Sequence, residues 1–233
     1  MSIMRFDILT IFPEIINAYL NESISKRARE RVLVYMRVHN LRDFTEDKHH
    51  KIDDRPFGGG PGMVIKIEPI MRAVEKISGS LTSVSPEVRL PEILIVILAA
   101  GGKQFDSKQA QQFSKKYGHI ILVAGHYEGI DARVKKVLSA KCKVLSVSIG
   151  EYVLTGGELP ALVILDAVAR HIPGVLGKEE SLEEKRHGVG VPTYTRPEVF
   201  EYKGKKYKIP GVLKSGDHKK IAAWRSTRRR ASP

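Results

Sequence analysis

With 233 residues and 42% hydrophobic side chains, the chain can form one large domain or two smaller ones around a real core. Its net charge of +13 and its isoelectric point near 9.8 predict a polyanionic partner, nucleic acid first. No apolar run approaches the roughly 20 residues of a transmembrane helix. The single Cys142 excludes an intramolecular disulfide and fits a reducing cytoplasm.

The first third of the chain predicts a strand, two helices and a second strand. The N-terminal segment has an acid inside its apolar stretch and no small-residue cleavage site, so we expect no signal peptide. Alternating and periodic apolar residues then place the four elements. They are a strand over 5–10, a helix opened by Pro13, a charged helix over 26–31 and a strand over 32–38.

A polar loop over residues 40–63 follows, and loops longer than about 12 residues inside a compact domain are usually functional or disordered. It combines histidines and acids with a glycine-rich tip: His49, His50, Asp53, Asp54, Arg55, Gly58, Gly59, Gly60 and Gly62. The preferred interpretation is a glycine-lined wall against a flat ligand such as a base. A P-loop would need Gly-Lys-Ser/Thr, and a zinc site lacks a fourth ligand, whereas a plain flexible loop stays an open alternative.

Further along, a helix over 67–77 and a surface excursion over 78–92 precede three apolar strands. The strands cover 93–98, 119–124 and 143–149. Each ends in a glycine-containing loop before a helix, and the loops cover 99–102, 125–131 and 150–157. This alternation predicts an α/β domain with a parallel sheet. Because ligands bind at the carboxyl ends of parallel strands, we expect the three loops to converge on one site. Glycines used only for turn geometry are the alternative.

The C-terminal part is basic and separated from the rest. The polar segment 177–192 is typical of a linker between domains. Residues 201–233 hold seven lysines and four arginines against Glu201 and Asp217. Aromatic residues lie among these charges: Tyr202, Tyr207 and Trp224. A turn or hairpin over 202–207 and a helix capped by Asp217 predict a folded nucleic-acid-binding surface rather than a solvated basic tail.

Five motifs in chain order carry a resemblance to a known family. They are D-D-R-P-F-G-G-G-P-G-M at 53–63, G-H-Y-E-G-I-D at 125–131, S-I-G-E-Y-V-L-T-G-G-E-L-P at 148–160, I-P-G-V-L-G at 172–177 and Y-T-R-P-E-V at 194–199. Together they are highly specific and cover nearly the whole chain. The chain resembles the bacterial tRNA (guanine-N1)-methyltransferases, the TrmD family of the SPOUT class.

The resemblance implies an α/β fold with a trefoil knot, which is a rare exception to normal chain connectivity. It implies a knotted catalytic domain over 1–176, a linker over 177–192 and a small, mainly helical tRNA-binding domain over 193–233. It also implies a cytoplasmic homodimer with each active site at the subunit interface. The implied activity is methylation of the guanosine immediately 3′ of the anticodon (position 37) from S-adenosyl-L-methionine, with assistance from Mg²⁺.

Residue by residue, the resemblance implies two sets of binding residues. The S-adenosylmethionine-binding set is Leu98, Gly125, Tyr127, Glu128, Ile149, Gly150, Tyr152, Leu154, Gly156, Gly157 and Pro160. The substrate-binding set is His50, Asp54, Gly59, Gly60 and Tyr194. At 99–102 the small residues A-A-G-G replace the family's Ser-Pro-Gln-Gly, and we expect cofactor binding to survive that change. The chain ends soon after Trp224-Arg225, which predicts a shortened C-terminal domain.

Methylation of guanine N1 requires a base to remove the N1 proton and a cation near O6, where negative charge develops. Arg170 falls at the family's arginine position, although a helix C-terminus also favours an ordinary arginine. The family's catalytic Asp position is occupied by Lys185, which leaves Glu184, or Glu183, as the candidate base. Both glutamates could instead be solvated linker charges. A non-catalytic or altered-specificity SPOUT-fold RNA-binding protein is therefore the alternative function, and a ribosomal RNA enzyme is a third.

Overall fold

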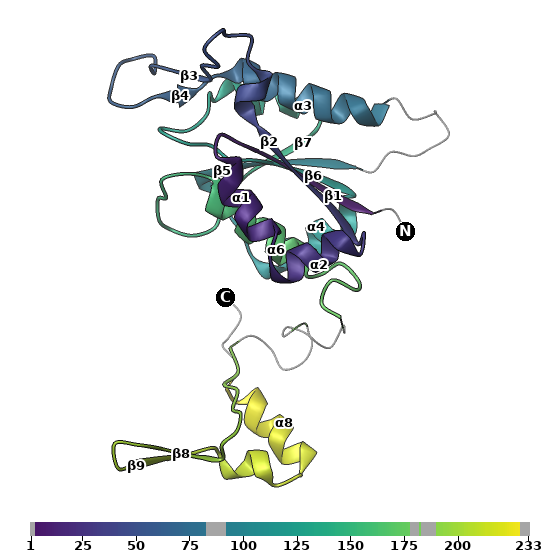
Figure 1. Ribbon diagram of the computed structural model, residues 1–233, viewed down its shortest axis with the longest axis vertical. Helices are drawn as coiled ribbons and strands as arrows, with labels where there is room; N and C mark the ends of the chain where they lie inside the picture. Colours follow the sequence, from purple (N-terminus) through teal and green to yellow (C-terminus); the bar gives the residue numbers. More distant parts are fainter. Residues whose placement is uncertain (1–2, 83–91, 178–181, 183–189, 229–233) are drawn as a thin grey trace. The chain divides into compact units, whose positions relative to one another are not determined.

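The computed structural model describes residues 3–82, 92–177, 182 and 190–228 (Figure 1). The chain divides into two compact units, Met1–Val175 and Leu176–Pro233. Among the described residues, no helix has the length and apolar character needed to cross a membrane.

The first unit is built on a five-stranded parallel sheet. Its strands are β1 (Met4–Thr10), β2 (Val34–Asn40), β5 (Ile93–Gln104), β6 (His119–Val123) and β7 (Lys143–Ser148). They are ordered β2-β1-β6-β5-β7, and every neighbouring pair is parallel. The continuous apolar runs of β5 and β6 suit strands covered on both faces. The predicted α/β class with a parallel sheet is confirmed.

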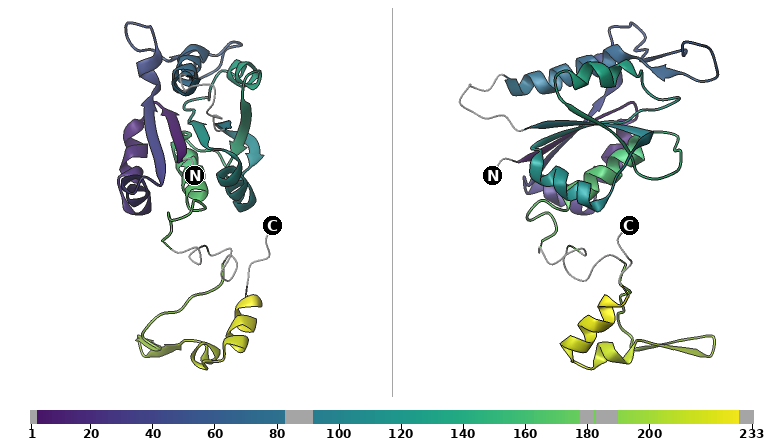
Figure 2. Two further views of the ribbon diagram at one scale, coloured as in Figure 1. Left: turned by 90° about the vertical axis from the view of Figure 1, so that its right-hand side faces the viewer. Right: turned by 180° about the vertical axis from the view of Figure 1, so that it is seen from behind.

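Among the described residues, helices cover both faces of the sheet, as the edge-on view shows (Figure 2). On one face lie α1 (Pro13–Leu20), α2 (Ser23–Glu30), α4 (Ser107–Lys116) and α6 (Glu158–Ala169), which share one buried cluster with Leu94 and Val96 of β5. On the other lie α3 (Ile67–Thr82) and α5 (Arg133–Ser139), which pack with Ile95 and Ile97. Successive β5 side chains thus pack against the helices on opposite faces of the sheet.

The helix ends agree with the sequence signals. Pro13 begins α1. Asp106 caps α4, because its side chain accepts a hydrogen bond from the backbone N–H of Gln109 at 2.7 Å. The helix α6 begins after Gly157, with Glu158 in its first turn, where the helix dipole favours a carboxylate.

Strand β5 does not end at Leu98 as predicted. Leu98 pairs with Val147, residues 99–102 leave the ladder, and Lys103 then pairs with the same Val147 before Gln104 reaches Ser148. The four small residues therefore form an interruption inside a strand rather than the tip after it. A side chain at Gly102 would place its Cβ 2.5 Å from the Val147 backbone nitrogen. The polar Lys103 and Gln104 carry no apolar alternation, so sequence patterning missed the second part of the strand.

The long loop is more ordered than predicted. It contains the 3-10 helix η1 (Leu41–Phe44) and the two-residue strand β3 (Asp53–Asp54), which pairs antiparallel with β4 (Val64–Ile65). Helix α3 also continues past the predicted end at Ile77 to Thr82. Most of the predicted surface excursion lies outside the described residues.

A buried carboxylate on β1 joins three neighbouring strands. Asp7 is fully buried, and its oxygens lie 2.6 Å from Nε2 of His39 on β2 and 2.7 Å from Nε2 of His119 on β6, with Arg5 as a third partner. Burial works to raise the pKa of Asp7. The hydrogen bonds from His119, His39 and Arg5 outweigh it and hold that pKa well below its usual range.

The second unit combines a hairpin with a helix. Strands β8 (Val199–Tyr202) and β9 (Lys205–Lys208) are joined through Lys203 and Gly204, both with positive φ, as tight hairpin turns require. The 3-10 helix η3 (Gly211–Lys214) and α8 (His218–Ser226) follow. The predicted hairpin and the Asp217 cap are confirmed. The described part of this unit is mixed rather than mainly helical.

Candidate active site

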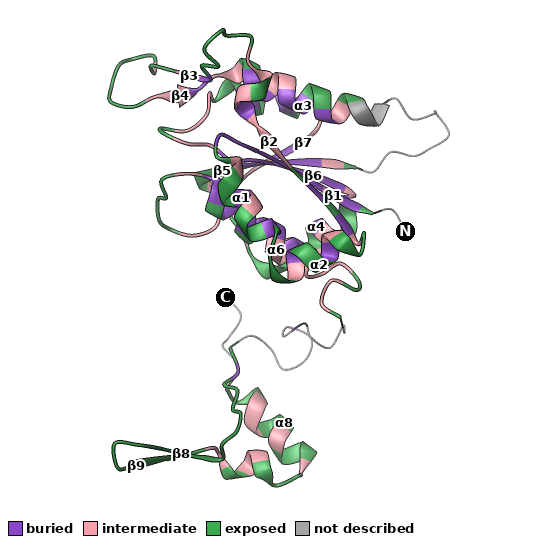
Figure 3. Cartoon of the chain, viewed as in Figure 1, coloured by how far each residue is buried: buried purple, intermediate pink, exposed green. Residues whose placement is uncertain are grey.

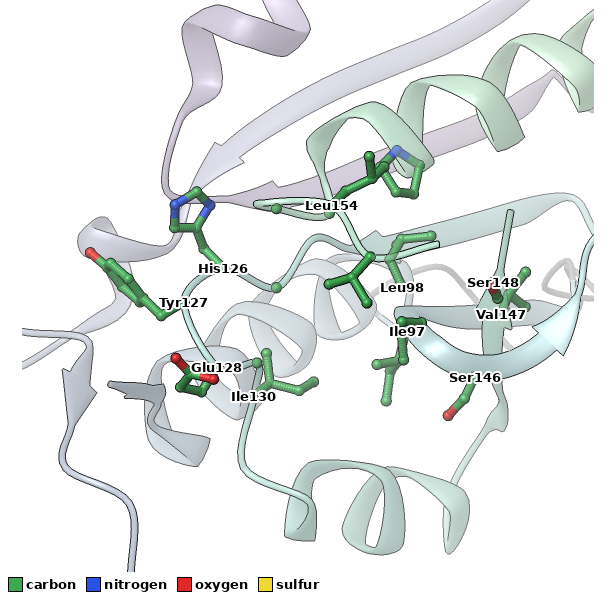
Figure 4. A pocket seen from close by; sticks show the side chains of 18 of the residues that line it. Ile97, Leu98, His126, Tyr127, Glu128, Ile130, Ser146, Val147, Ser148 and Leu154 are labelled. Atoms are coloured by element: carbon green, nitrogen blue, oxygen red, sulfur yellow. The ribbon is translucent and has the colours of Figure 1, made fainter. Parts of the chain in front are cut away.

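A cavity of about 440 Å³ opens at the interruption of β5 and beyond the ends of β6 and β7 (Figure 4). Its walls come from 97–100, 125–132, 146–149 and 152–157, together with Lys135 and Pro160. In the close view, His126, Tyr127 and Glu128 form one side, Leu98 and Leu154 lie at the centre, and Val147 lies on the far side. The predicted convergence of the three loops on one site is confirmed.

Of the predicted cofactor residues, all except Gly150 line this cavity. They are Leu98, Gly125, Tyr127, Glu128, Ile149, Tyr152, Leu154, Gly156, Gly157 and Pro160. Gly150 lies beside it, because a Cβ there would meet the Tyr152 ring at 2.1 Å. The glycine therefore leaves room for the tyrosine that does line the cavity.

The pair Gly156-Gly157 is required by close packing between two loops. The backbone N–H of Gly157 donates to the Gly125 carbonyl at 2.7 Å, and a Cβ on Gly157 would lie 2.8 Å from the Cα of Ala124. A Cβ on Gly156 would meet the carboxylate of Glu158 and the ring of His126. Neither contact leaves space for a methyl group, so the 150–157 loop can approach the 125–131 loop only through glycine.

A buried pair beside the cavity was missed by sequence reasoning. Glu158 is almost fully buried and accepts a hydrogen bond from the Thr10 hydroxyl at 2.7 Å. Its other oxygen lies 3.7 Å from Nδ1 of His126, whose ring packs edge-on against Phe12 and Tyr127. His126 stood inside a recognised motif, but no signal connects Thr10 to Glu158, which lies 148 positions away. The carboxylate thus links β1, helix α6 and the cavity wall.

The glycine-rich loop is tied to the same wall. The N–H of Glu128 donates to the Met63 carbonyl at 3.0 Å, and the N–H of Ile65 donates to the Gly129 carbonyl at 3.0 Å. Gly62 lies against the Glu128 side chain, which a Cβ would approach to 2.3 Å. These contacts place the end of the 40–63 loop beside the cavity.

The tip of that loop is open. Gly58, Gly59 and Gly60 all have positive φ, and nothing lies within 4 Å of a Cβ built on any of them. Their glycine requirement is therefore conformational rather than steric. His50 lies at the base of the loop with Nδ1 3.1 Å from the Arg42 carbonyl, and Asp54 is exposed with its carboxylate 3.8 Å from Nζ of Lys66.

Metal binding finds no support in this loop, which the structure describes completely. No group of three or more His, Cys, Asp or Glu side chains within it, or elsewhere in the described residues, has the geometry to hold an ion. His49 and His50 therefore belong to no such group in the described part of the chain.

Comparison with known proteins decides the family. The sequence model described as "tRNA (Guanine-1)-methyltransferase TrmD" matches residues 4–232. The chain belongs to this family. Curated relatives named tRNA (guanine-N(1)-)-methyltransferase include those of Dictyoglomus turgidum, Clostridioides difficile and Carboxydothermus hydrogenoformans. They are 47%, 46% and 45% identical, each over 95% of this chain and over 83%, 90% and 81% of their own lengths.

In this TrmD-family chain, the predicted catalytic residue Arg170 lies away from the cavity. Arg170 follows α6 at its C-terminal end, twelve residues after Glu158, so the rise of 1.5 Å per residue places it ~18 Å along the helix. It is not among the cavity-lining residues. Glu184, with Glu183 and Lys185, lies outside the described residues. Tyr194 belongs to the second unit, where its ring lies 6.2 Å from that of Trp224.

Proposed function

We propose that this chain methylates N1 of the guanosine immediately 3′ of the anticodon, position 37, in tRNA with S-adenosyl-L-methionine as the methyl donor. The observation that carries the proposal is the cavity, whose wall coincides with the residues that the family resemblance implies for the donor. The net charge of +13 supports a tRNA substrate. The single cysteine supports action in the cytoplasm.

The cavity fits the donor by size and chemistry. Its volume of about 440 Å³ lies within the range of small-molecule sites, roughly 300–1,000 Å³. Leu98, Ile149 and Leu154 supply apolar wall for an adenine ring, and the glycines expose backbone groups for its polar edge. When bound, S-adenosylmethionine supplies a methyl group on a sulfonium. We also propose that the chain carries the trefoil knot of the SPOUT class, as the family resemblance implies.

We place the guanosine between the cavity and the loop that ends at Met63, with His50, Asp54, Gly59 and Gly60 on the substrate side. The open glycine tip supports this, because it leaves backbone exposed to a flat base. Residues 193–233, including Tyr194, form the proposed tRNA-binding part. Assistance by Mg²⁺ is part of the proposal, and the described residues contain no group of three or more His, Cys, Asp or Glu side chains that could hold the ion.

The position of Arg170 supports a homodimer in which its guanidinium reaches the partner's cavity and stabilises charge on guanine O6. An apolar surface on α1 and α6 suits such an interface. Ile15 and Tyr19 are exposed four residues apart on α1, as are Leu159 and Val163 on α6. The Tyr19 hydroxyl donates to Asp166 at 2.8 Å, which joins the two helices side by side. Burial and that hydrogen bond raise the pKa of Tyr19 to about 12.

Glu184 is the proposed general base for the N1 proton. Because Lys185 occupies the family's Asp position, a second candidate function is a SPOUT-fold protein that binds RNA without transferring a methyl group. Replacement of Glu184 by Gln separates the two, because a general base must accept the N1 proton and the amide of glutamine is not basic enough to do so. Transfer that is indifferent to Glu184→Gln rules this residue out as the base.

The test uses two tRNA transcripts that differ only at the target nucleotide, guanosine in one and adenosine in the other. After incubation with protein and donor, mass spectrometry should find 1-methylguanosine in the first transcript alone. A protein that binds donor and tRNA yet yields no 1-methylguanosine would refute the proposed function and favour the second candidate. Gly157→Ala should weaken donor binding in calorimetry, because its Cβ would lie 2.8 Å from the backbone nitrogen of Gly125 and displace the cavity wall there.

A further inference from the structure

The hairpin β8–β9 presents three aromatic rings on one face. Phe200 pairs directly with Tyr207 across the hairpin, and Tyr202 follows Phe200 by two positions, so all three side chains leave the same side of the ladder. Their exposed fractions are 55%, 55% and 54%, respectively. Both strands are exposed along their whole length (Figure 3). Within the described residues, these rings therefore form a surface rather than a core.

Two of the rings are held in a common orientation. The planes of Phe200 and Tyr202 differ by 11°, with 6.3 Å between ring centroids. Same-face side chains of one strand repeat every ~6.6 Å, so the backbone itself sets this spacing. Parallel ring faces offer planar surfaces on which bases of a single strand can stack without regard to sequence.

Positive charge borders this face, and the hairpin's acid lies behind it. Lys205 pairs with Tyr202 and so leaves the same side, and Nζ of Lys203 lies 5.5 Å from the Tyr202 ring centroid. Glu201, the one acid among ten residues that include four lysines, points to the other face and lies 3.9 Å from Lys206. Within residues 199–208, the aromatic face therefore combines rings with cations and carries no carboxylate, and Glu198, which precedes β8, is paired with Lys214.

Trp224 differs from these rings, although the sequence groups it with them. It is half-buried, with the Tyr194 ring at 6.2 Å and the Arg228 guanidinium over it at 4.4 Å. Its faces are already used within its own unit. The hairpin rings remain more than half exposed, although Lys203 lies over the Tyr202 ring, so their free faces are available to a ligand.

We propose that the face formed by Phe200, Tyr202 and Tyr207 stacks on unpaired nucleotides of the bound tRNA, while Lys203 and Lys205 neutralise neighbouring phosphates. The inference rests on the proposed function, because it takes tRNA as the ligand. A surface bordered by lysines complements a polyanion such as tRNA in charge. Stacking on aromatic rings together with phosphate neutralisation is how proteins hold single-stranded nucleic acid.

The test measures binding of full-length protein to the guanosine-containing tRNA transcript over a series of salt concentrations. Phe200→Ala and Tyr202→Ala should each weaken binding about 5- to 140-fold, which converts to ~1–3 kcal/mol. Tyr202→Phe keeps the ring and should bind within about twofold of the parent. The salt slope should stay unchanged in these variants and fall by about one in Lys205→Ala. Val199→Ala, on the opposite face of the same hairpin, is the matched control.

Two results would overturn the proposal. One is binding within twofold of the parent in both alanine variants. The other is full binding by Tyr202→Leu, because an apolar side chain without a ring can satisfy a protein contact but not stacking. Methyl transfer measured in parallel separates this inference from the proposed function. If binding depends on the rings but no 1-methylguanosine forms, stacking is supported and the proposed function is refuted. If 1-methylguanosine forms but binding does not depend on the rings, the proposed function is supported and stacking is refuted.

Discussion

The neighbouring glycines Gly101 and Gly102 allow a test of how closely the interrupted part of β5 packs against β7. A Cβ on Gly102 would lie 2.5 Å from the nitrogen and 2.6 Å from the carbonyl carbon of Val147, whereas a Cβ on Gly101 meets nothing within 4 Å. Neither glycine has a positive φ, so conformational strain does not separate the two. Gly102→Ala should therefore be costly and Gly101→Ala nearly neutral.

The size of the effect follows from ordinary contact distances. Non-bonded carbon atoms rest ~3.5–4.0 Å apart, so the two backbones would have to separate by roughly 1 Å. Overpacking of this kind destabilises by about 1–3 kcal/mol. At about 2–4 °C per kcal/mol for a chain of this size, the melting temperature should fall by roughly 2–12 °C.

Because Val147 also lines the cavity, donor affinity should fall together with stability. Differential scanning calorimetry and donor titration of the two variants check both quantities. Equal melting temperatures for Gly101→Ala and Gly102→Ala would refute the close passage of the strands and, with it, the assigned interruption of β5.

Three further predictions concern charge, catalysis and assembly. Asp7→Asn should lower stability at pH 7 by ~3–5 kcal/mol, because it leaves buried partners unpaired. The folded-state pKa of Asp7 lies below its unfolded value near ~3.9, so its stabilisation is complete above that pH and is lost as the pH falls toward the folded value. Urea denaturation at pH 7, 5 and 3 should show that acid loss in the parent and not in the variant. Arg170→Ala should reduce methyl transfer at least ~100-fold, the size expected for the loss of one charge-stabilising group, and should leave donor binding near the parent value. Loss of donor affinity in calorimetry contradicts that role. Leu159→Asp with Val163→Asp should give monomers in sedimentation, whereas Val137→Asp, exposed on α5, should not; a dimer that persists in the double variant places the interface elsewhere.

The elements around the cavity were predictable because their signals are local. The apolar run of β5 and the glycines after β6 and β7 determine strand, turn and helix within a few residues, and parallel strands bring such turns to one edge. The predicted cofactor residues from Gly125 to Pro160 came instead from the family resemblance, through the motifs that contain them.

Long-range partners were not predictable from the pattern. The hydrogen bond between Thr10 and Glu158 depends on how α6 meets β1, and the histidines around Asp7 meet only through the register of three strands. Each of these polar residues looks like an ordinary strand or helix residue in isolation. The second part of β5 was missed because the polar residues Lys103 and Gln104 do not continue the apolar pattern that marks a strand.

The mixed hairpin-and-helix unit has one consequence for how the chain behaves without RNA. None of the residues of β8, β9, η3 or α8 is buried. A fragment confined to 190–233 would gain little from desolvation on folding, and a lone two-stranded ribbon is marginal in water. Its shape should then depend on the nucleic acid that it meets, and association should show the large negative heat-capacity change of folding coupled to binding.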